Sequence, residues 1–142
     1  MASSILQPVV ALVLWTFVME AWLYATRIPA LRKTGAPLDP GMTAAELANM
    51  LPPQVRWKAD NYNHLLEQPT IFYATALALA VSGQVGGLDA ALAWGYVGLR
   101  VIHSLVQATV NVILIRFSIF MASSLVLLVL AVRAALAVFQ AG

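Results

Sequence analysis

The sequence predicts an all-α integral membrane protein in which four helices pack as a bundle. Of its 142 residues, 61% are apolar and only 10% are charged, whereas about a quarter of the residues in an average soluble protein are charged. The apolar residues lie in blocks long enough to cross a hydrocarbon core of about 30 Å. Because lipid offers no partners for open backbone groups, we expect these blocks to be helical.

The first predicted span covers about residues 5–25 and contains one charged residue, Glu20. No Lys or Arg precedes it and no small-residue cleavage pattern follows, so we expect a retained helix rather than a secretory signal. Residues 26–53 are then expected to form a cytoplasmic loop. Within this loop, Thr43 and Glu46 have the spacing of a helix capping box, so we expect a short ordered helix there.

The second predicted helix covers about residues 54–82. It is expected to begin outside the membrane near Gln54 and to enter the membrane near Glu67. A short glycine-rich segment follows, which predicts a hairpin loop.

The apolar sequence after residue 87 is about twice as long as one span, so it must fold back once. Thr109 and Asn111 are the best candidates for that turn. We therefore predict the third and fourth helices at about residues 88–108 and 112–138. The chain of residues 1–142 is expected to form one domain.

The distribution of positive charge predicts the orientation in the membrane. Basic residues follow the first span, whereas the loop over residues 82–89 has none; those near the first loop are Arg27, Arg32, Lys33, Arg56 and Lys58. Because cytoplasmic loops are enriched in Lys and Arg, the first loop is expected to be cytoplasmic, and four spans then place both termini outside. The net charge of +2 includes no basic run, so no nucleic-acid partner is expected.

Several polar residues occur where lipid disfavours them. Asp60, Asn63 or His64, and Glu67 form a stripe at helical spacing on the second helix. On the third helix, Arg100, His103 and Gln107 form another, and Arg116 opens the fourth. If these helices are neighbours, the result is a pocket for a small anionic ligand with several carboxylates.

The polar residues also have simpler interpretations. A Glu–Arg pair between two helices is often only a structural contact that lowers the cost of insertion. An isolated histidine such as His103 is more often packed against its neighbours than used as a catalytic base. Two histidines without further ligands make a poor metal site, so no metal is expected. With no cysteine in the chain, sulfur chemistry requires a bound small molecule.

Two segments carry a family resemblance. The first is Arg56-Trp-Lys-Ala-Asp-Asn-Tyr-Asn-His-Leu-Leu-Glu67-Gln-Pro69-Thr-Ile-Phe-Tyr73, and the second is Arg100-Val-Ile-His103 followed by Gln107 and Arg116. Together they resemble the MAPEG family (membrane-associated proteins in eicosanoid and glutathione metabolism), in particular its bacterial-type members. The resemblance implies a homotrimer in a bacterial inner membrane, with sites between subunits on the cytoplasmic side. It also implies glutathione as co-substrate.

By position in these motifs, the resemblance implies that Asn63 or His64 and Glu67 contact the glutathione backbone. Arg100, His103 and Gln107 would lie near it and complete the ligand-binding set. Arg116 is the implied catalytic residue, because a guanidinium beside the glutathione sulfur stabilises the thiolate. An apolar second substrate would reach that thiolate from the bilayer.

The expected function is therefore a membrane-bound, glutathione-dependent transferase or peroxidase that acts on hydrophobic electrophiles. A second hypothesis is a non-catalytic protein of the same fold that binds a lipid, a thiol or a partner. It is favoured by Gln107, where family enzymes commonly have Tyr, and by His64, where Asn is expected. A third hypothesis is a small four-helix exporter that uses Glu20 as a proton-coupling carboxylate.

Overall fold

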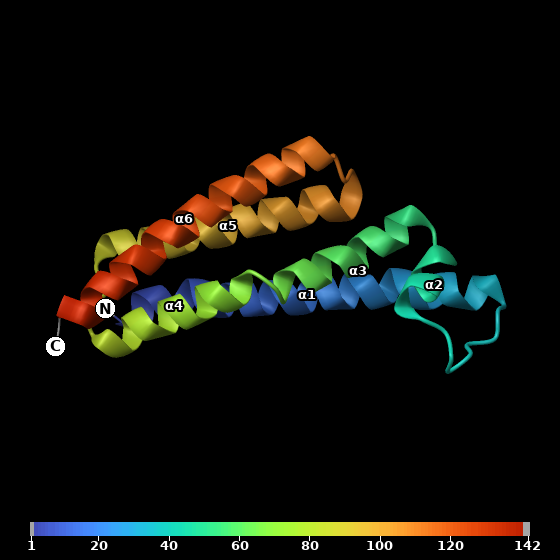
Figure 1. Ribbon diagram of the computed structural model, residues 1–142, viewed down its shortest axis with the longest axis horizontal. Helices are drawn as coiled ribbons and strands as arrows, with labels where there is room; N and C mark the ends of the chain where they lie inside the picture. Colours follow the sequence, from blue (N-terminus) through green and yellow to red (C-terminus); the bar gives the residue numbers. More distant parts are fainter. Residues whose placement is uncertain (1, 141–142) are drawn as a thin grey trace.

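The computed structural model describes residues 2–140, and every regular element in that range is a helix (Figure 1). The all-α prediction is therefore confirmed for these residues. The helices are α1 (Ala2–Thr34), α2 (Ala44–Asn49), α3 (Pro53–Leu65), α4 (Pro69–Ser82), α5 (Gly87–Thr109) and α6 (Ile113–Gln140).

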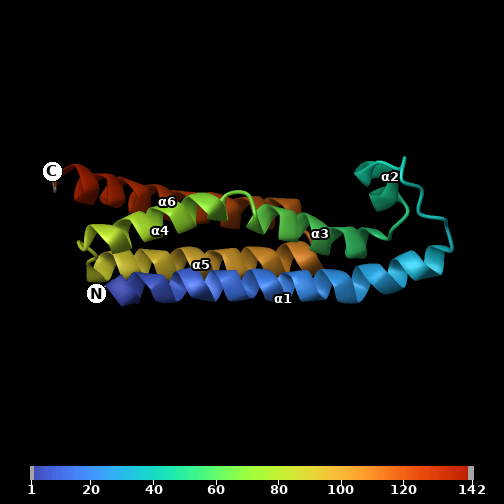
Figure 2. The ribbon, with the colours of Figure 1, turned by 90° about the horizontal axis from the view of Figure 1, so that it is seen from below.

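The long helices lie side by side along the longest axis of the molecule (Figures 1 and 2). Helix α5 packs against α1 and α6, whereas α3 and α4 follow each other and pack along α1. Helix α3 also contacts α5, and α4 contacts α6. Both described ends of the chain lie at one end of the molecule, and α2 lies at the other end with the last turns of α1 (Figure 1).

Three helical segments are long and apolar enough to cross a membrane, among the residues that the structure describes. These are Ala2–Thr34, Pro53–Ser82 and Ile113–Gln140. Helix α5, which is the third of the four spans expected from the sequence, is not among them. It carries polar residues at Asp89, Arg100, His103 and Gln107.

Helix α1 differs from the expected span because it continues through Thr34, so residues 26–34 are helical rather than part of a loop. Arg32 and Lys33 lie in its last turn, where positive charge interacts favourably with the helix dipole. The helix ends just before Gly35, whose φ of 59° is left-handed. Glycine adopts this conformation readily at the end of a helix.

The segment expected as one helix over residues 54–82 is divided at Pro69. Proline has no N–H to donate to the preceding turn. In a continuous helix, its ring would also collide with the carbonyl group four residues earlier. Instead, the N–H groups of Leu66 and Glu67 donate to the carbonyl groups of Asn63 (3.0 Å) and His64 (3.2 Å). These tighter bonds end α3 and leave Glu67 and Gln68 in the turn before α4.

A second turn joins α5 to α6. Asn111 has a φ of 48°, and Asn is one of the few residues other than glycine that tolerates the left-handed region. At the opposite end of α5, the backbone N–H of Gly86 donates to Asp89 Oδ2 at 2.7 Å. The Asp89 side chain is buried and also pairs with Arg133 of α6.

Helix α2 begins with a capping box that has a testable pH dependence. The N–H of Thr43 donates to Glu46 Oε2 at 2.7 Å, and the N–H of Glu46 donates to Thr43 Oγ1 at 3.2 Å. The hydrogen bonds from Thr43 lower the pKa of Glu46 below its usual value of 4.5. The stabilisation is therefore present above pH 4.5 and is lost as the pH falls through the lower pKa of the folded state.

We accordingly expect the backbone carbon shifts of α2, measured by NMR in micelles, to lose helical character below pH 4.5. The variant Glu46→Gln is the matched control, because its amide does not titrate in this range. If native and Glu46→Gln proteins showed the same pH profile, the carboxylate would not be the group responsible.

Candidate functional site

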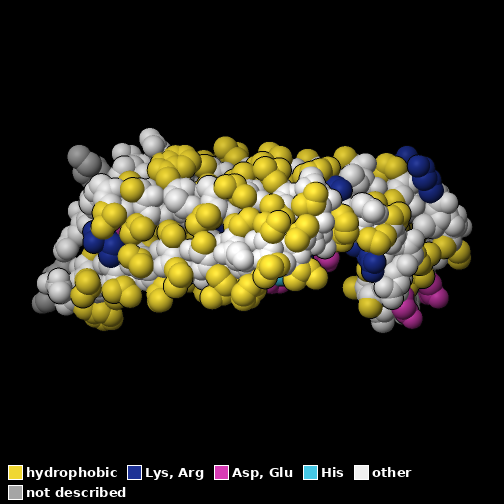
Figure 3. Space-filling model, turned by 90° about the horizontal axis from the view of Figure 1, so that it is seen from above, with side chains coloured by type: hydrophobic (Ala, Val, Ile, Leu, Met, Phe, Trp, Pro, Cys, Tyr) yellow, Lys and Arg dark blue, Asp and Glu magenta, His cyan; other side chains and the backbone are white. Residues whose placement is uncertain are grey.

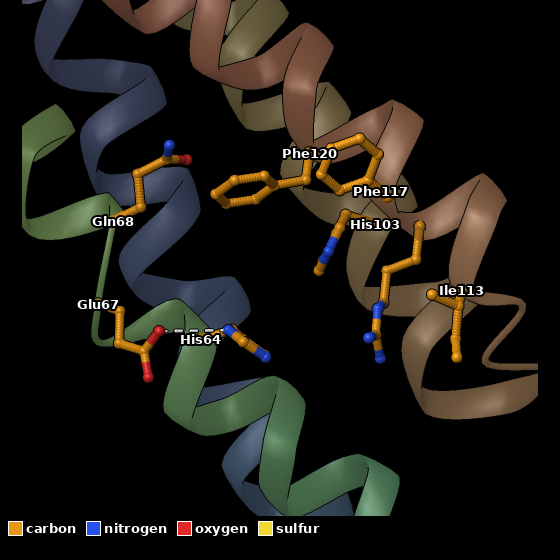
Figure 4. Close-up of a pocket in the computed structure, with 8 residues that line it drawn as sticks. His64, Glu67, Gln68, His103, Ile113, Phe117 and Phe120 are labelled. Atoms are coloured by element: carbon orange, nitrogen blue, oxygen red, sulfur yellow. Dashed lines mark ion pairs between the residues drawn. The ribbon is translucent and has the colours of Figure 1, made fainter.

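A cavity of about 270 Å³ lies where the end of α3 approaches the α5–α6 turn (Figure 4). Its lining combines ionisable, amide and aromatic side chains. The lining residues are His64, Glu67, Gln68, His103, Ile113, Arg116, Phe117 and Phe120. They come from the end of α3 and the turn after it, from α5 and from α6.

One wall of the cavity comes from the end of α3 and carries an imidazole and a carboxylate. His64 Nδ1 and Glu67 Oε2 are 3.3 Å apart (Figure 4). Pro69 positions this pair, since it ends the helix within one turn of His64. The Glu67 side chain is 65% exposed, so the carboxylate can accept further hydrogen bonds.

The facing wall carries His103 of α5 and Arg116 of α6. The His103 ring is buried, and its centroid lies 6.3 Å from that of His64 and 6.2 Å from that of Phe120. Arg116 Nη1 donates to Asn111 Oδ1 at 2.6 Å. The turn between α5 and α6 therefore orients the guanidinium of Arg116.

Arg100 lies beside the cavity rather than in its lining. Its side chain is fully buried, and Nη2 donates to the backbone carbonyl group of His64 at 3.4 Å. Its guanidinium carbon is 5.9 Å from the centroid of the Phe120 ring. Nε and Nη1 have no hydrogen-bond partner within residues 2–140, so this cation retains donors for a further polar group.

The structure separates the seven candidate residues into three groups. His64, Glu67, His103 and Arg116 line the cavity. Arg100 supports the cavity wall through the backbone of His64. The remaining two candidates do not line it, since Asn63 is exposed and Gln107 is buried within α5. Of the alternatives Asn63 and His64, it is His64 that lines the cavity.

Gln68 was not among the candidates, although it connects three helices at the cavity. Its Oε1 accepts a hydrogen bond from the Tyr96 hydroxyl at 3.2 Å, and its Nε2 donates to Ser124 Oγ at 2.8 Å. It therefore attaches the turn before α4 to α5 and to α6. The signal in the sequence was an amide between Glu67 and Pro69, in a region expected to lie within the membrane.

Replacing Gln68 by Leu should remove both of these hydrogen bonds and lower the free energy of unfolding by about 2 kcal/mol, because each typical bond contributes about 1 kcal/mol. Thermal unfolding in detergent would measure the change. Tyr96→Phe is the matched control, since it removes only the bond from the Tyr96 hydroxyl to Gln68 and should have about half the effect. Equal stability of native and Gln68→Leu proteins would contradict this role.

A buried amide near the cavity was also missed. Asn61 lies on α3, three residues before His64, and its side chain is fully buried. Neither of its amide atoms has a hydrogen-bond partner among the described residues. Ser104 Oγ and Gln107 Oε1 on α5 share this property. Helices α3 and α5 therefore each bury polar side chains.

The arrangement combines a cationic group, a carboxylate and an apolar surface in one cavity. Arg116 offers N–H donors to an anion, whereas Glu67 accepts from a cation. Phe117 and Phe120 supply apolar contact area from α6. Such a mixture suits a small polar ligand with charges of both signs beside an apolar reactant.

Comparison with known proteins identifies one family. The family model described as "MAPEG family" matches residues 5–136, which is most of the chain. Neither a curated protein nor a solved structure matches the sequence.

Proposed function

Because this chain belongs to the MAPEG family, we propose that it is a membrane-bound, glutathione-dependent transferase or peroxidase that acts on hydrophobic electrophiles. The observation that carries the proposal is the cavity in which His64 and Glu67 of one wall meet His103 and Arg116 of the other. The chain contains no cysteine, so glutathione supplies the reactive sulfur.

The charges of the cavity complement those of glutathione, which has two carboxylates and one ammonium group. The positive charge of Arg116 attracts the anionic groups of the ligand. The exposed carboxylate of Glu67 accepts from the ammonium group. Gln68 and His64 bind the peptide groups of the ligand, as amide and imidazole side chains can both donate and accept.

Arg116 also has the chemical role in this proposal. A guanidinium beside the thiol favours its ionised form and so lowers its pKa, and the proton passes to solvent. In the transferase reaction, the thiolate sulfur forms a bond to an electrophilic carbon and the leaving group departs with its electron pair. Phe117 and Phe120 hold the apolar electrophile next to the sulfur.

In the peroxidase reaction, the same thiolate attacks the terminal oxygen of a hydroperoxide, the O–O bond breaks, and the leaving alkoxide takes a proton from solvent to become an alcohol. The resulting sulfenic acid reacts with a second glutathione to give the disulfide and water. Both reactions need an ionised sulfur, which Arg116 stabilises in each case.

We propose that α5 also spans the membrane, as the third of four spans along the chain. Its 23 residues extend about 34 Å, enough for a hydrocarbon core of about 30 Å. Its polar residues Asp89, Arg100, His103 and Gln107 are buried, whereas apolar residues such as Trp94 and Ile102 are exposed. The polar side chains thus face the protein, which is how membrane helices accommodate them.

A homotrimer with cytoplasmic sites completes the proposal. Exposed apolar side chains on α1 and α6, such as Leu14, Phe17 and Phe117, provide surfaces for neighbouring subunits as well as for lipid. The basic residues after the first span favour a cytoplasmic first loop, which places both termini on the other side. A bacterial inner membrane remains a prediction from the resemblance.

The alternative is a MAPEG protein that binds a thiol or lipid without turnover. It is favoured by Gln107, which replaces the Tyr common in family enzymes and does not line the cavity. Under this alternative, the cavity retains its ligand but lacks a group needed for chemistry.

Assays of the reconstituted protein test the proposal. We expect it to consume glutathione faster than the uncatalysed reaction with an apolar aryl halide or with an organic hydroperoxide. Glutathione binding without turnover would support the non-catalytic alternative. Absence of both binding and turnover would contradict a glutathione site of either kind.

A further inference from the structure

A groove, separate from the candidate site, lies beside the last turns of α1. It has a volume of about 490 Å³ and lies between α1 and the connection from α2 to α3. Ala25, Pro29 and Lys33 line it from α1, and Met50, Pro52 and Val55 line it from the other side. The α1 residues recur every four positions, so they form one stripe along the helix.

The position of this groove along α1 corresponds to the boundary of the membrane. Helix α1 has 33 residues and is about 50 Å long, which exceeds the hydrocarbon thickness of about 30 Å. Glu20 is its only charged residue before Arg27. One turn before the groove, Trp22 lies under Lys58, whose Nζ is 5.1 Å from the ring centroid. In membrane proteins, tryptophan is enriched at the interface between lipid and water.

The surroundings of the groove are positively charged. Residues 26–58 contain five Lys or Arg residues and two acidic residues, Asp39 and Glu46, a local net charge of +3. The rest of the chain therefore has a net charge of −1, since the total is +2. Figure 3 shows Lys and Arg side chains at the end of the molecule that carries α2.

We propose that this groove binds a membrane phospholipid with an anionic headgroup. The groove runs along α1 from the apolar Ala25 to the cationic Lys33, a rise of about 12 Å. A lipid that lies along it places its glycerol and upper acyl chain against Ala25 and Pro29. Its phosphate then lies beside the ammonium group of Lys33. A lysine binds a phosphate as a point charge.

The charge and shape of the groove favour a lipid over a soluble anion. Most of its lining is apolar, including Ala30, Met50 and Val55, and a free phosphate gains nothing from such a surface. A phospholipid uses both parts, because its acyl chain buries apolar area while its headgroup meets Lys33. The inference concerns a site distinct from the glutathione cavity and does not depend on it.

Native mass spectrometry tests the proposal with protein released from nanodiscs that contain equal amounts of phosphatidylglycerol and phosphatidylcholine. We expect the native chain to retain phosphatidylglycerol preferentially. Lys33→Gln should lower that preference about fivefold, the effect of one basic residue near an anionic membrane. The matched control is Arg32→Gln, which removes the same charge from the same helix but from a residue outside the groove lining.

An equal effect of Lys33→Gln and Arg32→Gln would show general surface attraction and would overturn the site. Ala30→Trp provides a second test, because it fills the groove without changing charge and should reduce retention of both lipids. Ala30→Leu is the milder version if the tryptophan variant fails to fold by circular dichroism. Unchanged lipid retention in a folded groove-filling variant would also overturn the proposal.

Discussion

Replacing Arg116 by Gln is expected to lower the turnover number with glutathione about a hundredfold, the usual effect of removing one group that stabilises a developing anion. In the proposed mechanism the guanidinium keeps the glutathione sulfur ionised. Without it, a smaller fraction of the bound thiol is ionised at neutral pH. The variant should therefore regain rate as the pH rises toward the pKa of the free thiol.

The pH–rate profile separates this role from a structural one. Arg116→Lys should restore part of the activity, because it keeps the positive charge but loses the planar set of donors. Arg27→Gln is the control, since it removes a basic residue that lies outside the cavity lining. An Arg116→Gln enzyme with native turnover and a native pH profile would show that another group stabilises the thiolate.

Replacing Asp89, which pairs with Arg133 between α5 and α6, by Ala should have the largest effect on stability. Asp89 is buried, whereas the Arg133 side chain is 37% exposed, so solvent weakens the attraction relative to a fully buried pair. We expect Asp89→Asn to lower the free energy of unfolding by about 2 kcal/mol. Asp89→Ala should cost about 3 kcal/mol, since it also removes the acceptor for the N–H of Gly86.

A double-mutant cycle with Arg133→Met measures the pair directly. If the two side chains interact, the loss from Asp89→Asn should be smaller when Arg133 is already replaced. Unfolding would be followed by circular dichroism in detergent. Additive effects of the two substitutions would contradict an energetic contribution from the ion pair.

The sequence could predict the elements whose signals are local. The turn between α5 and α6 occurs at Asn111, a residue type that tolerates a left-handed conformation. The capping box of Thr43 and Glu46 also depends on short-range spacing. In both cases, the chemistry of a few neighbouring residues is sufficient to indicate where a helix begins or ends.

Helix ends that depend on more distant effects were harder to foresee. The apolar pattern could not show that α1 continues through Thr34, because that end of the helix is polar and packs near α3. Pro69 is present in the sequence, but the apolar residues that follow it suggest one continuous span. The division into α3 and α4 follows from the missing N–H of proline, which apolar periodicity does not reveal.

In the candidate site, too, local patterns were predictable and contacts between distant residues were not. Helical spacing identified His64, Glu67 and His103 as polar residues on two helices, and the structure places them around one cavity. Gln68 was missed because its role depends on Tyr96 and Ser124, which are distant in sequence. Similarly, the pairing of Asp89 with Arg133 depends on the register of α5 against α6.

The measurement that tests the central proposal most directly is calorimetric titration of the detergent-solubilised protein with glutathione near neutral pH. The native chain should bind glutathione, and both Arg116→Ala and Glu67→Ala should bind it at least tenfold more weakly, because truncating one partner of a charged contact typically costs more than 1.4 kcal/mol. Absence of binding by the native chain, or native affinity in both variants, would contradict a glutathione site in this cavity.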